Sequence, residues 1–199
     1  MSLVGLFDMD GTLFDHDQAV LRDLELLRAP GEKKIVQLHN MDDIPHMRAR
    51  IDLIRRQPGW WKNLEKYQPG WDVYRAAVRL GYCIEILTKG PRTKPAAWME
   101  KVECLQKHLG EDVIANIVGK SKKRYYGRFL CDDFPDYCEE WLEHRPRGLV
   151  IMPAHHYNKK FKHPRAVRYT GKNLDQVRAA LKIAKNRKDG EPLDLKGIV

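Results

Sequence analysis

The chain is organised by one stretch near its start, Leu3-Val4-Gly5-Leu6-Phe7-Asp8-Met9-Asp10-Gly11-Thr12-Leu13. Its apolar run ends at two aspartates one residue apart, followed at once by a glycine and a threonine. Residues two apart in a strand point to the same side, so Asp8 and Asp10 are expected to converge where the strand ends. Neighbouring carboxylates raise each other's pKa, and a divalent cation with oxygen ligands relieves that repulsion. The alternative is a strand that merely runs into an acidic turn.

The composition is that of an ordinary globular protein of 199 residues, of which 43% are hydrophobic. This length allows one core domain and a modest insertion. No apolar run is long enough to span a membrane, and the first residues lack the basic region of a signal peptide. The four cysteines form no CxxC pair, and three of them adjoin apolar residues and are expected to be reduced core thiols, which favours a cytoplasmic location.

The formal net charge of +9 favours an anionic partner, either nucleic acid or a small substrate. Much of the excess lies in the basic, histidine-rich segment 154–169, for which a solvated surface is the simpler explanation. Three histidines of this segment, together with a cysteine, also suggest a zinc site: His155, His156, His163 and Cys138. Their spacing is not typical of structural zinc sites, so we favour surface histidines.

Apolar strand patterns alternate with helical ones, which predicts an α/β fold with a parallel sheet and helices on both faces. No strand pattern occurs between Leu13 and Tyr82. We therefore predict a helical cap at 15–71, inserted into a core domain at 1–14 and 72–186, with a loosely ordered tail at 187–199. Ligands of such sheets bind outside the carboxyl ends of the strands. The polar residues that could carry chemistry fall at predicted strand ends: Asp8, Asp10, Thr88, Asp132 and Asp133, with the basic loop around Lys122.

Three tryptophans lie close together in the predicted cap, at Trp60, Trp61 and Trp71. One explanation is a hydrophobic patch that docks the cap on the core. The other is an aromatic wall that stacks on a flat substrate such as a nucleobase. The local pattern favours neither.

The string Asp8-Met9-Asp10-Gly11-Thr12 resembles the first motif, DxDGT, of the haloacid-dehalogenase-like (HAD) superfamily. Thr88 is similar to the second motif, a Ser or Thr that ends a strand. Lys122 is our choice for the third-motif lysine, with Lys120 and Lys123 as competitors, and Asp132-Asp133 resembles the fourth, acidic motif. The resemblance implies a HAD-like Rossmannoid fold, with a three-layer parallel sheet and a small helical cap after the first strand.

A closer resemblance is to the 5'(3')-deoxyribonucleotidases (C-type 5'-nucleotidases). Pro58-Gly59-Trp60-Trp61-Lys62-Asn63-Leu64 is similar to their PGFF-x-x-L segment, and Phe129-Leu130-Cys131-Asp132-Asp133 to their LLIDD strand. The sequence departs from that family at Lys89, where those enzymes carry a small hydroxyl residue.

These resemblances imply a role for each motif residue. Asp8 is the expected nucleophile, and Asp10 the general acid and base. Mg²⁺ would be held by Asp8, the backbone carbonyl of Asp10, and a carboxylate of Asp132 or Asp133. The remaining expected contacts are with phosphate, from Gly11, Thr12, Thr88, Lys89 and Lys122, and with the rest of the substrate, from Trp60 and Trp61.

The resulting prediction is a Mg²⁺-dependent phosphomonoesterase that hydrolyses nucleoside monophosphates or deoxynucleotides through an aspartyl-phosphate. Two alternatives stay open: a phosphatase of polynucleotide ends, and an inactive HAD-like protein that binds nucleic acid. The expected partner is therefore a small phosphate monoester first and nucleic acid second, with no membrane, and the sequence leaves a homodimer open.

Overall fold

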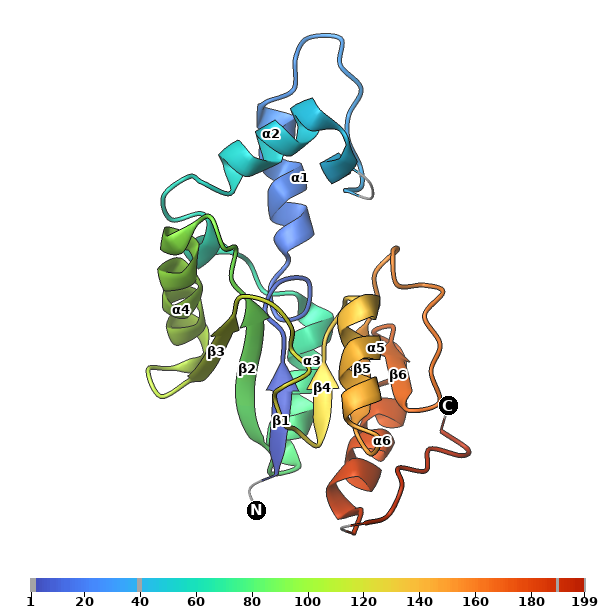
Figure 1. Cartoon of the computed structure of the whole chain (residues 1–199). Helices are drawn as coiled ribbons and strands as arrows, with labels where there is room; N and C mark the ends of the chain where they lie inside the picture. The colour runs from blue at the N-terminus through green and yellow to red at the C-terminus, as the bar shows by residue number, and fades with distance from the viewer. Residues whose placement is uncertain (1–2, 39–40, 189, 199) are drawn as a thin grey trace.

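A computed structural model of the chain describes residues 3–38, 41–188 and 190–198. Within these ranges a single sheet of six parallel strands has the order β3-β2-β1-β4-β5-β6 (Figure 1). The strands are β1 (Val4–Phe7), β2 (Cys83–Lys89), β3 (Ile114–Val118), β4 (Phe129–Cys131), β5 (Leu149–Pro153) and β6 (Ala166–Tyr169). The strand order reverses beside β1, which therefore ends where parallel sheets bind their ligands.

Helices cover both faces of the sheet, because the strand side chains are apolar on both. Phe7 belongs to a hydrophobic cluster with α3 (Gln68–Arg79), α4 (Pro95–Leu109) and α6 (Leu174–Asn186). Its neighbour Leu6 belongs to a second cluster with α5 (Pro135–His144). Successive strand residues point to opposite faces, so this division produces the predicted three layers.

The segment between β1 and α3 forms a cap over the carboxyl ends of the strands (Figure 1). It contains α1 (His16–Leu26), the 3₁₀ turn η1 (Met41–Asp43), α2 (Pro45–Ile54) and the 3₁₀ turn η2 (Trp61–Asn63). Helix α1 starts at an Asp15 carboxylate that accepts a hydrogen bond from the Gln18 amide at 3.1 Å, a typical N-cap. The helix α3 begins inside the range 15–71 that we predicted for the cap, and it packs on the sheet.

Strand β6 was not predicted. Its four residues, Ala-Val-Arg-Tyr, lie in a basic segment and include a charged side chain, so they lack the apolar run that marks the other strands. Pairing with β5 creates the strand, since Val150 to Pro153 align with Ala166 to Tyr169. In the segment after α6, Leu193 and Leu195 are buried in the larger hydrophobic cluster, which fastens this part of the tail to the core.

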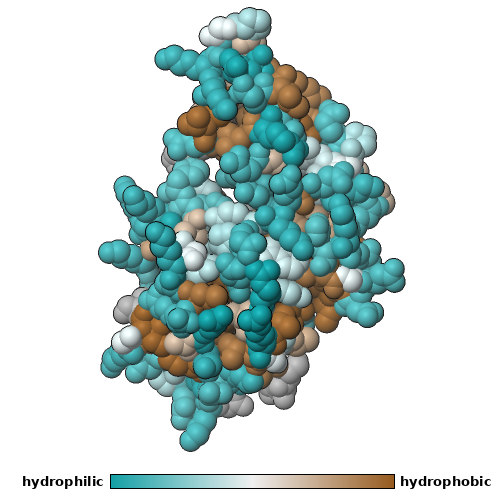
Figure 2. All heavy atoms as spheres, turned by 180° about the vertical axis from the view of Figure 1, so that it is seen from behind, coloured by the Kyte–Doolittle hydropathy of each residue, from teal (hydrophilic) through white to brown (hydrophobic). Residues whose placement is uncertain are grey.

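The face opposite to that of Figure 1 shows hydrophobic side chains in the cap and low on the core, with mainly hydrophilic ones between them (Figure 2). Among the helices in the described ranges, none has the length and hydrophobicity that crossing a membrane requires.

Candidate active site

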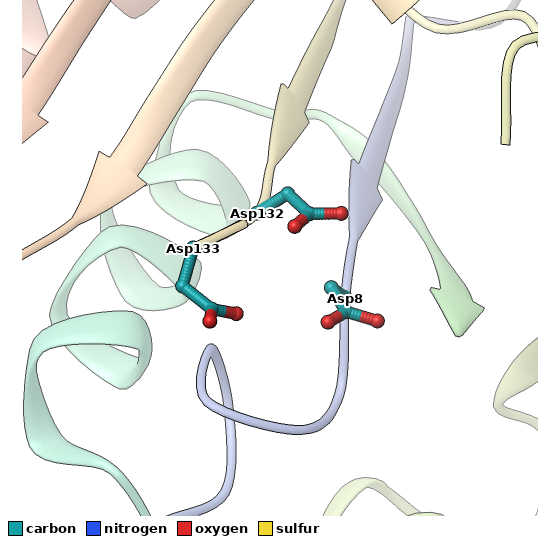
Figure 3. A group of neighbouring side chains, drawn as sticks. All are labelled: Asp8, Asp132 and Asp133. Atoms are coloured by element: carbon teal, nitrogen blue, oxygen red, sulfur yellow. The ribbon is translucent and has the colours of Figure 1, made fainter. Parts of the chain in front are cut away.

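Three carboxylates meet at the carboxyl ends of two neighbouring strands. Asp8 follows β1, and Asp132 and Asp133 follow β4, which pairs with β1 through Phe7 and Cys131. One oxygen from each carboxylate lies within 4.8 Å of the other two, and the three side chains face a common space (Figure 3). The expected convergence at this edge is therefore present, although Asp8 meets the β4 aspartates rather than Asp10.

Lys122 is buried among these carboxylates. Its Nζ lies 2.7 Å from Asp8 Oδ1 and 2.6 Å from Asp132 Oδ2. Burial lowers the pKa of Lys122, but the charges of Asp132 and Asp8 outweigh burial and raise it above its usual value, so the amine is an ammonium ion. Of the three lysines that competed for the third motif, only Lys122 lies here: Lys120 is exposed, and Lys123 pairs with Glu140 at 3.1 Å.

The fourth-motif aspartates are held differently from each other. Asp132 accepts hydrogen bonds from Lys122 and, at 3.0 Å, from the Phe134 amide. Asp133 accepts from the Thr12 hydroxyl at 2.8 Å and from the Tyr157 hydroxyl. Burial, and then the negative charge of Asp8, raise the pKa of both Asp132 and Asp133. A cation beside them would offset this cost.

The turn after Asp10 brings the chain close to Asp133. Gly11 has a φ of +76°, and a Cβ there would lie 2.5 Å from an Asp133 oxygen, so only glycine fits. Its N–H donates to the Phe14 carbonyl at 2.8 Å and its carbonyl accepts from His155 at 2.6 Å. We predicted Gly11 as a backbone donor to phosphate. Its N–H is instead used inside the turn, so Gly11 contributes its conformation.

Asp10 is paired with a lysine that the sequence did not reveal to us. Lys101 Nζ donates to Asp10 Oδ2, to Thr88 Oγ1 at 3.1 Å and to the Lys89 carbonyl at 2.9 Å. The other Asp10 oxygen, Oδ1, is buried and has no hydrogen-bond partner in the described ranges. One Asp10 oxygen is thus fixed by Lys101, and the other is a buried acceptor that the described residues leave unpaired.

The two predicted phosphate-site residues of β2, Thr88 and Lys89, differ in whether they reach the cavity. Thr88 is fully buried and bonded to Lys101, and it does not line the cavity described next. Lys89 does line that cavity, and its Nζ donates to the Tyr137 hydroxyl at 2.7 Å.

A cavity of about 480 Å³ lies between the core and the cap, within the range of small-molecule sites. We call its two sides the core wall and the cap wall. The core wall includes Asp8, Asp10, Lys89, Lys122, Asp133 and Tyr157. The cap wall consists of His16, Asp17, Leu38, Ile51, Arg55 and Trp61.

The two predicted substrate-binding tryptophans have different positions. Trp61 lines the cavity, and its indole N–H donates to the Arg55 carbonyl at 3.0 Å. Trp60 does not line the cavity; it packs edge-on against Trp61 and donates to Asp23 at 2.7 Å. Both are nearly fully buried. Trp60 therefore supports the cap wall from behind.

A buried charge on α4 holds the segment that carries these tryptophans. Glu100 accepts hydrogen bonds from the Gly59 amide at 2.7 Å and from the Trp61 amide at 3.0 Å. Glu100 and Lys101 both lie on the buried stripe of α4. Two adjacent charges on a core-facing stripe were the sequence signal for Lys101, because lysine is rarely buried without a partner.

The cluster of Asp8, Asp132 and Asp133, which we call the acidic cluster, fits a hard divalent cation such as Mg²⁺. Its donors are carboxylate oxygens, the ligands such cations prefer. Four aspartates, Asp8, Asp10, Asp132 and Asp133, share two lysines, which leaves two negative charges uncompensated when all are ionised. Asp133 also faces the cavity, whereas Asp132 does not.

The zinc alternative has no geometric support. The acidic cluster is the one group of three or more metal-binding side chains that the described residues bring together. His155 donates to the Gly11 carbonyl, and His163 accepts from the Arg165 amide. His155 also stacks between Tyr67 and Tyr157, with ring centroids 4.6 and 4.9 Å away, so it braces the core wall.

No protein-family model and no curated protein matches this sequence. Among solved structures, a HAD family hydrolase from Deinococcus radiodurans R1, with bound phosphate and sodium, matches it over 92% of this chain and 96% of that chain. The identity is 14% and the TM-score 0.55. The chain has a HAD-like fold. This confirms the predicted fold class.

Two further HAD-like structures have lower TM-scores. A HAD hydrolase of family IA, variant 3, from Entamoeba histolytica HM-1:IMSS has 13% identity and a TM-score of 0.46, covering 90% of this chain and 100% of its own. A HAD-superfamily hydrolase from Ehrlichia chaffeensis has 11% identity and a TM-score of 0.47, covering 94% and 100%.

Proposed function

We propose that the chain is a Mg²⁺-dependent phosphomonoesterase that hydrolyses nucleoside monophosphates, deoxynucleotides included, through an aspartyl-phosphate on Asp8. One observation carries the proposal. Asp8 and Asp10 line the same cavity, and the buried Oδ1 of Asp10 has no partner among the described residues. A nucleophile and a proton carrier thus line one cavity, as phosphoryl transfer to a carboxylate requires.

In the first half-reaction, a carboxylate oxygen of Asp8 attacks phosphorus, and the bond from phosphorus to the leaving alcohol breaks. Lys122 holds the Asp8 carboxylate in position through its ion pair with Oδ1. The leaving oxygen takes a proton from Asp10, whose Oδ2 is anchored by Lys101. In the second half-reaction, Asp10 takes a proton from water, which attacks phosphorus, releases phosphate and regenerates Asp8.

Asp8, Asp133 and the Asp10 carbonyl would hold Mg²⁺, with Asp132 as the alternative carboxylate. The bound ion would neutralise phosphate charge that the aspartates otherwise repel. Thr12 and Tyr157 position Asp133 for this task through their hydrogen bonds. The phosphate and sodium bound to the Deinococcus HAD family hydrolase support a phosphate site of this kind.

The nucleoside would lie against the cap wall. Leu38, Ile51 and Trp61 give this wall apolar surface, and an aromatic ring beside the cavity suits a nucleobase. The resemblance of the Pro58-Gly59-Trp60-Trp61 segment to the deoxyribonucleotidases supports the same class of substrate.

A phosphatase of polynucleotide ends is the second candidate. Lys159, Lys160 and Lys162 are exposed and follow closely on Tyr157, which lines the cavity. Such a run of lysines beside the site could bind the phosphates of an adjoining strand.

The test is phosphate release from ribo- and deoxynucleoside monophosphates and from short oligonucleotides with terminal phosphates, each with Mg²⁺ and with a chelator. We expect Mg²⁺-dependent release from some monophosphates, and none from the Asp8→Asn variant. Release from oligonucleotides alone would support the second candidate. Release that persists in the chelator, or in Asp8→Asn, would contradict the mechanism.

A further inference from the structure

Arg55 is the cationic side chain of the cap wall, and the proposed reaction leaves it without a task. It directly follows α2 as its C-terminal cap residue, is half-buried and lines the cavity. Its Nε donates to His16 Nε2 at 3.2 Å, and no carboxylate of the described residues lies within 4 Å of its guanidinium. The two terminal nitrogens of Arg55 have no hydrogen-bond partner in that part of the chain. Guanidinium groups bind anions through this edge, often with two parallel hydrogen bonds.

The orientation of Arg55 is built in. His16 Nδ1 lies 3.1 Å from Asp17 Oδ1, so a proton on Nδ1 leaves Nε2 as the acceptor for Arg55. The His16 ring also packs against Trp60 and Trp61, with centroids 5.4 and 5.6 Å away. Trp60 and Trp61 therefore fix the His16 ring. His16 in turn fixes the Nε edge of the Arg55 guanidinium and leaves its two terminal nitrogens available. Asp17 is bonded to the opposite side of the ring and forms no ion pair with Arg55.

A single phosphate bound at Asp8 would lie beside lysines of the core wall. Lys122 lies at Asp8, and Lys89 lines the same wall without a carboxylate partner in the described ranges. Arg55 comes from the cap, on the other side of the nucleophile's cavity. A fixed, unpaired guanidinium in a substrate cavity is costly to desolvate unless the substrate supplies an anion.

We propose that Arg55 binds a second anionic group of the substrate, a phosphate or a carboxylate, while Asp8 attacks the first. The inference rests on the proposed phosphatase function and adds to it a preference, among phosphate monoesters, for molecules with a second anionic group, such as nucleoside bisphosphates. It also assigns His16, Asp17 and the tryptophan pair to the positioning of Arg55.

The experiment measures binding by calorimetry in the presence of Mg²⁺, in the Asp8→Asn background, which prevents turnover. Deoxyadenosine 3',5'-bisphosphate is compared with deoxyadenosine 5'-monophosphate, and 2-phosphoglycolate with ethyl phosphate. The first pair tests a second phosphate, and the second pair a carboxylate. We expect the doubly anionic member of at least one pair to bind at least about tenfold more tightly, the effect of a charge-assisted contact.

The preference is then measured after Arg55→Gln, with Arg56→Gln as the matched control. Arg56 is the neighbouring arginine, is exposed and does not line the cavity. We expect Arg55→Gln to abolish the preference and Arg56→Gln to leave it unchanged. Equal affinities within both pairs, or a preference that survives Arg55→Gln, would overturn the proposal.

Hydrolysis of p-nitrophenyl phosphate by the unaltered chain distinguishes failure of the Arg55 proposal from failure of the proposed phosphatase function. Hydrolysis without a preference for double anions would leave the phosphatase standing and refute the role of Arg55. A preference that depends on Arg55, without any hydrolysis, would support the anion site and refute the phosphatase.

Discussion

The core wall and the cap wall of the same cavity differ in how their charged side chains are held. Buried lysines hold the carboxylates of the core wall: Lys101 and Lys122 are at most 1% exposed, and each is bonded to an aspartate of that wall. In the cap wall, Arg55 and Asp17 are bonded to His16, whose ring packs against Trp60, and the Asp17 side chain remains 28% exposed. Charges that are fixed and buried suit the chemical step. A partly solvated wall with aromatic side chains suits the recognition of the substrate. Substitutions in the two walls should therefore have different kinetic effects.

Asp8→Asn should have the largest effect of any single change in the core wall. Loss of the nucleophile is expected to lower turnover by about 10⁴-fold or more. The melting temperature should not fall, because the change removes one charge that raises the pKa values of Asp132 and Asp133. Phosphate release and thermal melts measure the two quantities. A folded Asp8→Asn protein with normal turnover would refute the mechanism.

Lys101→Met tests whether the lysine on α4 serves the chemistry. The change leaves Asp10 without its fixed partner, so we expect turnover to fall by about 10²-fold or more. Lys120→Met is the matched control, because Lys120 is exposed and lies outside the core wall. Equal turnover in both variants would mean that Lys101 has only a structural role.

Mg²⁺ should stabilise the protein through the core wall. At a concentration of about 100 times its Kd, a ligand that binds only the folded state contributes about 2.7 kcal/mol. We expect a higher melting temperature with Mg²⁺ than with a chelator, and no such difference after Asp133→Asn. A shift that persists in Asp133→Asn would place the ion elsewhere.

Trp61→Phe and Trp60→Phe compare a residue of the cap wall with the residue behind it. Trp61 faces the cavity and Trp60 does not, so Trp61→Phe should raise KM for nucleotides by about three- to tenfold, the effect of a partly lost stacking contact. The same variant should affect p-nitrophenyl phosphate less. If Trp60→Phe raised KM equally, both tryptophans would act only by holding the cap.

His163 lies outside both walls and should show a small effect of pH on stability. Burial, and then the charge of Arg165, lower the pKa of His163, and its Nδ1 accepts a hydrogen bond from the Arg165 amide. The unfolded chain therefore binds more protons than the folded one as pH falls below the usual histidine value, and stability is lost there. We expect a shallower acid loss of melting temperature in His163→Asn, with a difference of at most about one proton. Identical profiles would refute this.

The sequence predicted the core wall better than the cap wall, for a physical reason. Asp8, Asp132 and Asp133 follow apolar runs, and parallel strands bring their carboxyl ends to one edge whatever the loops do. The position of Lys101 depends on how α4 packs, and Tyr157 approaches Asp133 from a loop 24 residues further along the chain. Neither contact is local in sequence.

The cap wall depends on contacts that no periodic pattern encodes. The pattern near Trp60 and Trp61 was compatible with both a docking patch and a substrate wall, and the structure places Trp61 beside the cavity and Trp60 behind it, bonded to Asp23 of α1. Arg55 and His16 are 39 residues apart, and they meet because α1 and α2 pack together. Strand β6 escaped prediction for the same reason, since its pairing with β5 supplies what its composition lacks.

The most direct test of the account is to trap the phosphoryl group on Asp8. An Asp10→Asn variant should still be phosphorylated by p-nitrophenyl phosphate, whose leaving group needs no proton, but should lose its phosphoryl group slowly. After an acid quench, peptide mass spectrometry should find one added phosphoryl group on the peptide that contains Asp8. Phosphate release by the unaltered chain, with no phosphoryl group on that peptide in the Asp10→Asn variant, would contradict the central claim.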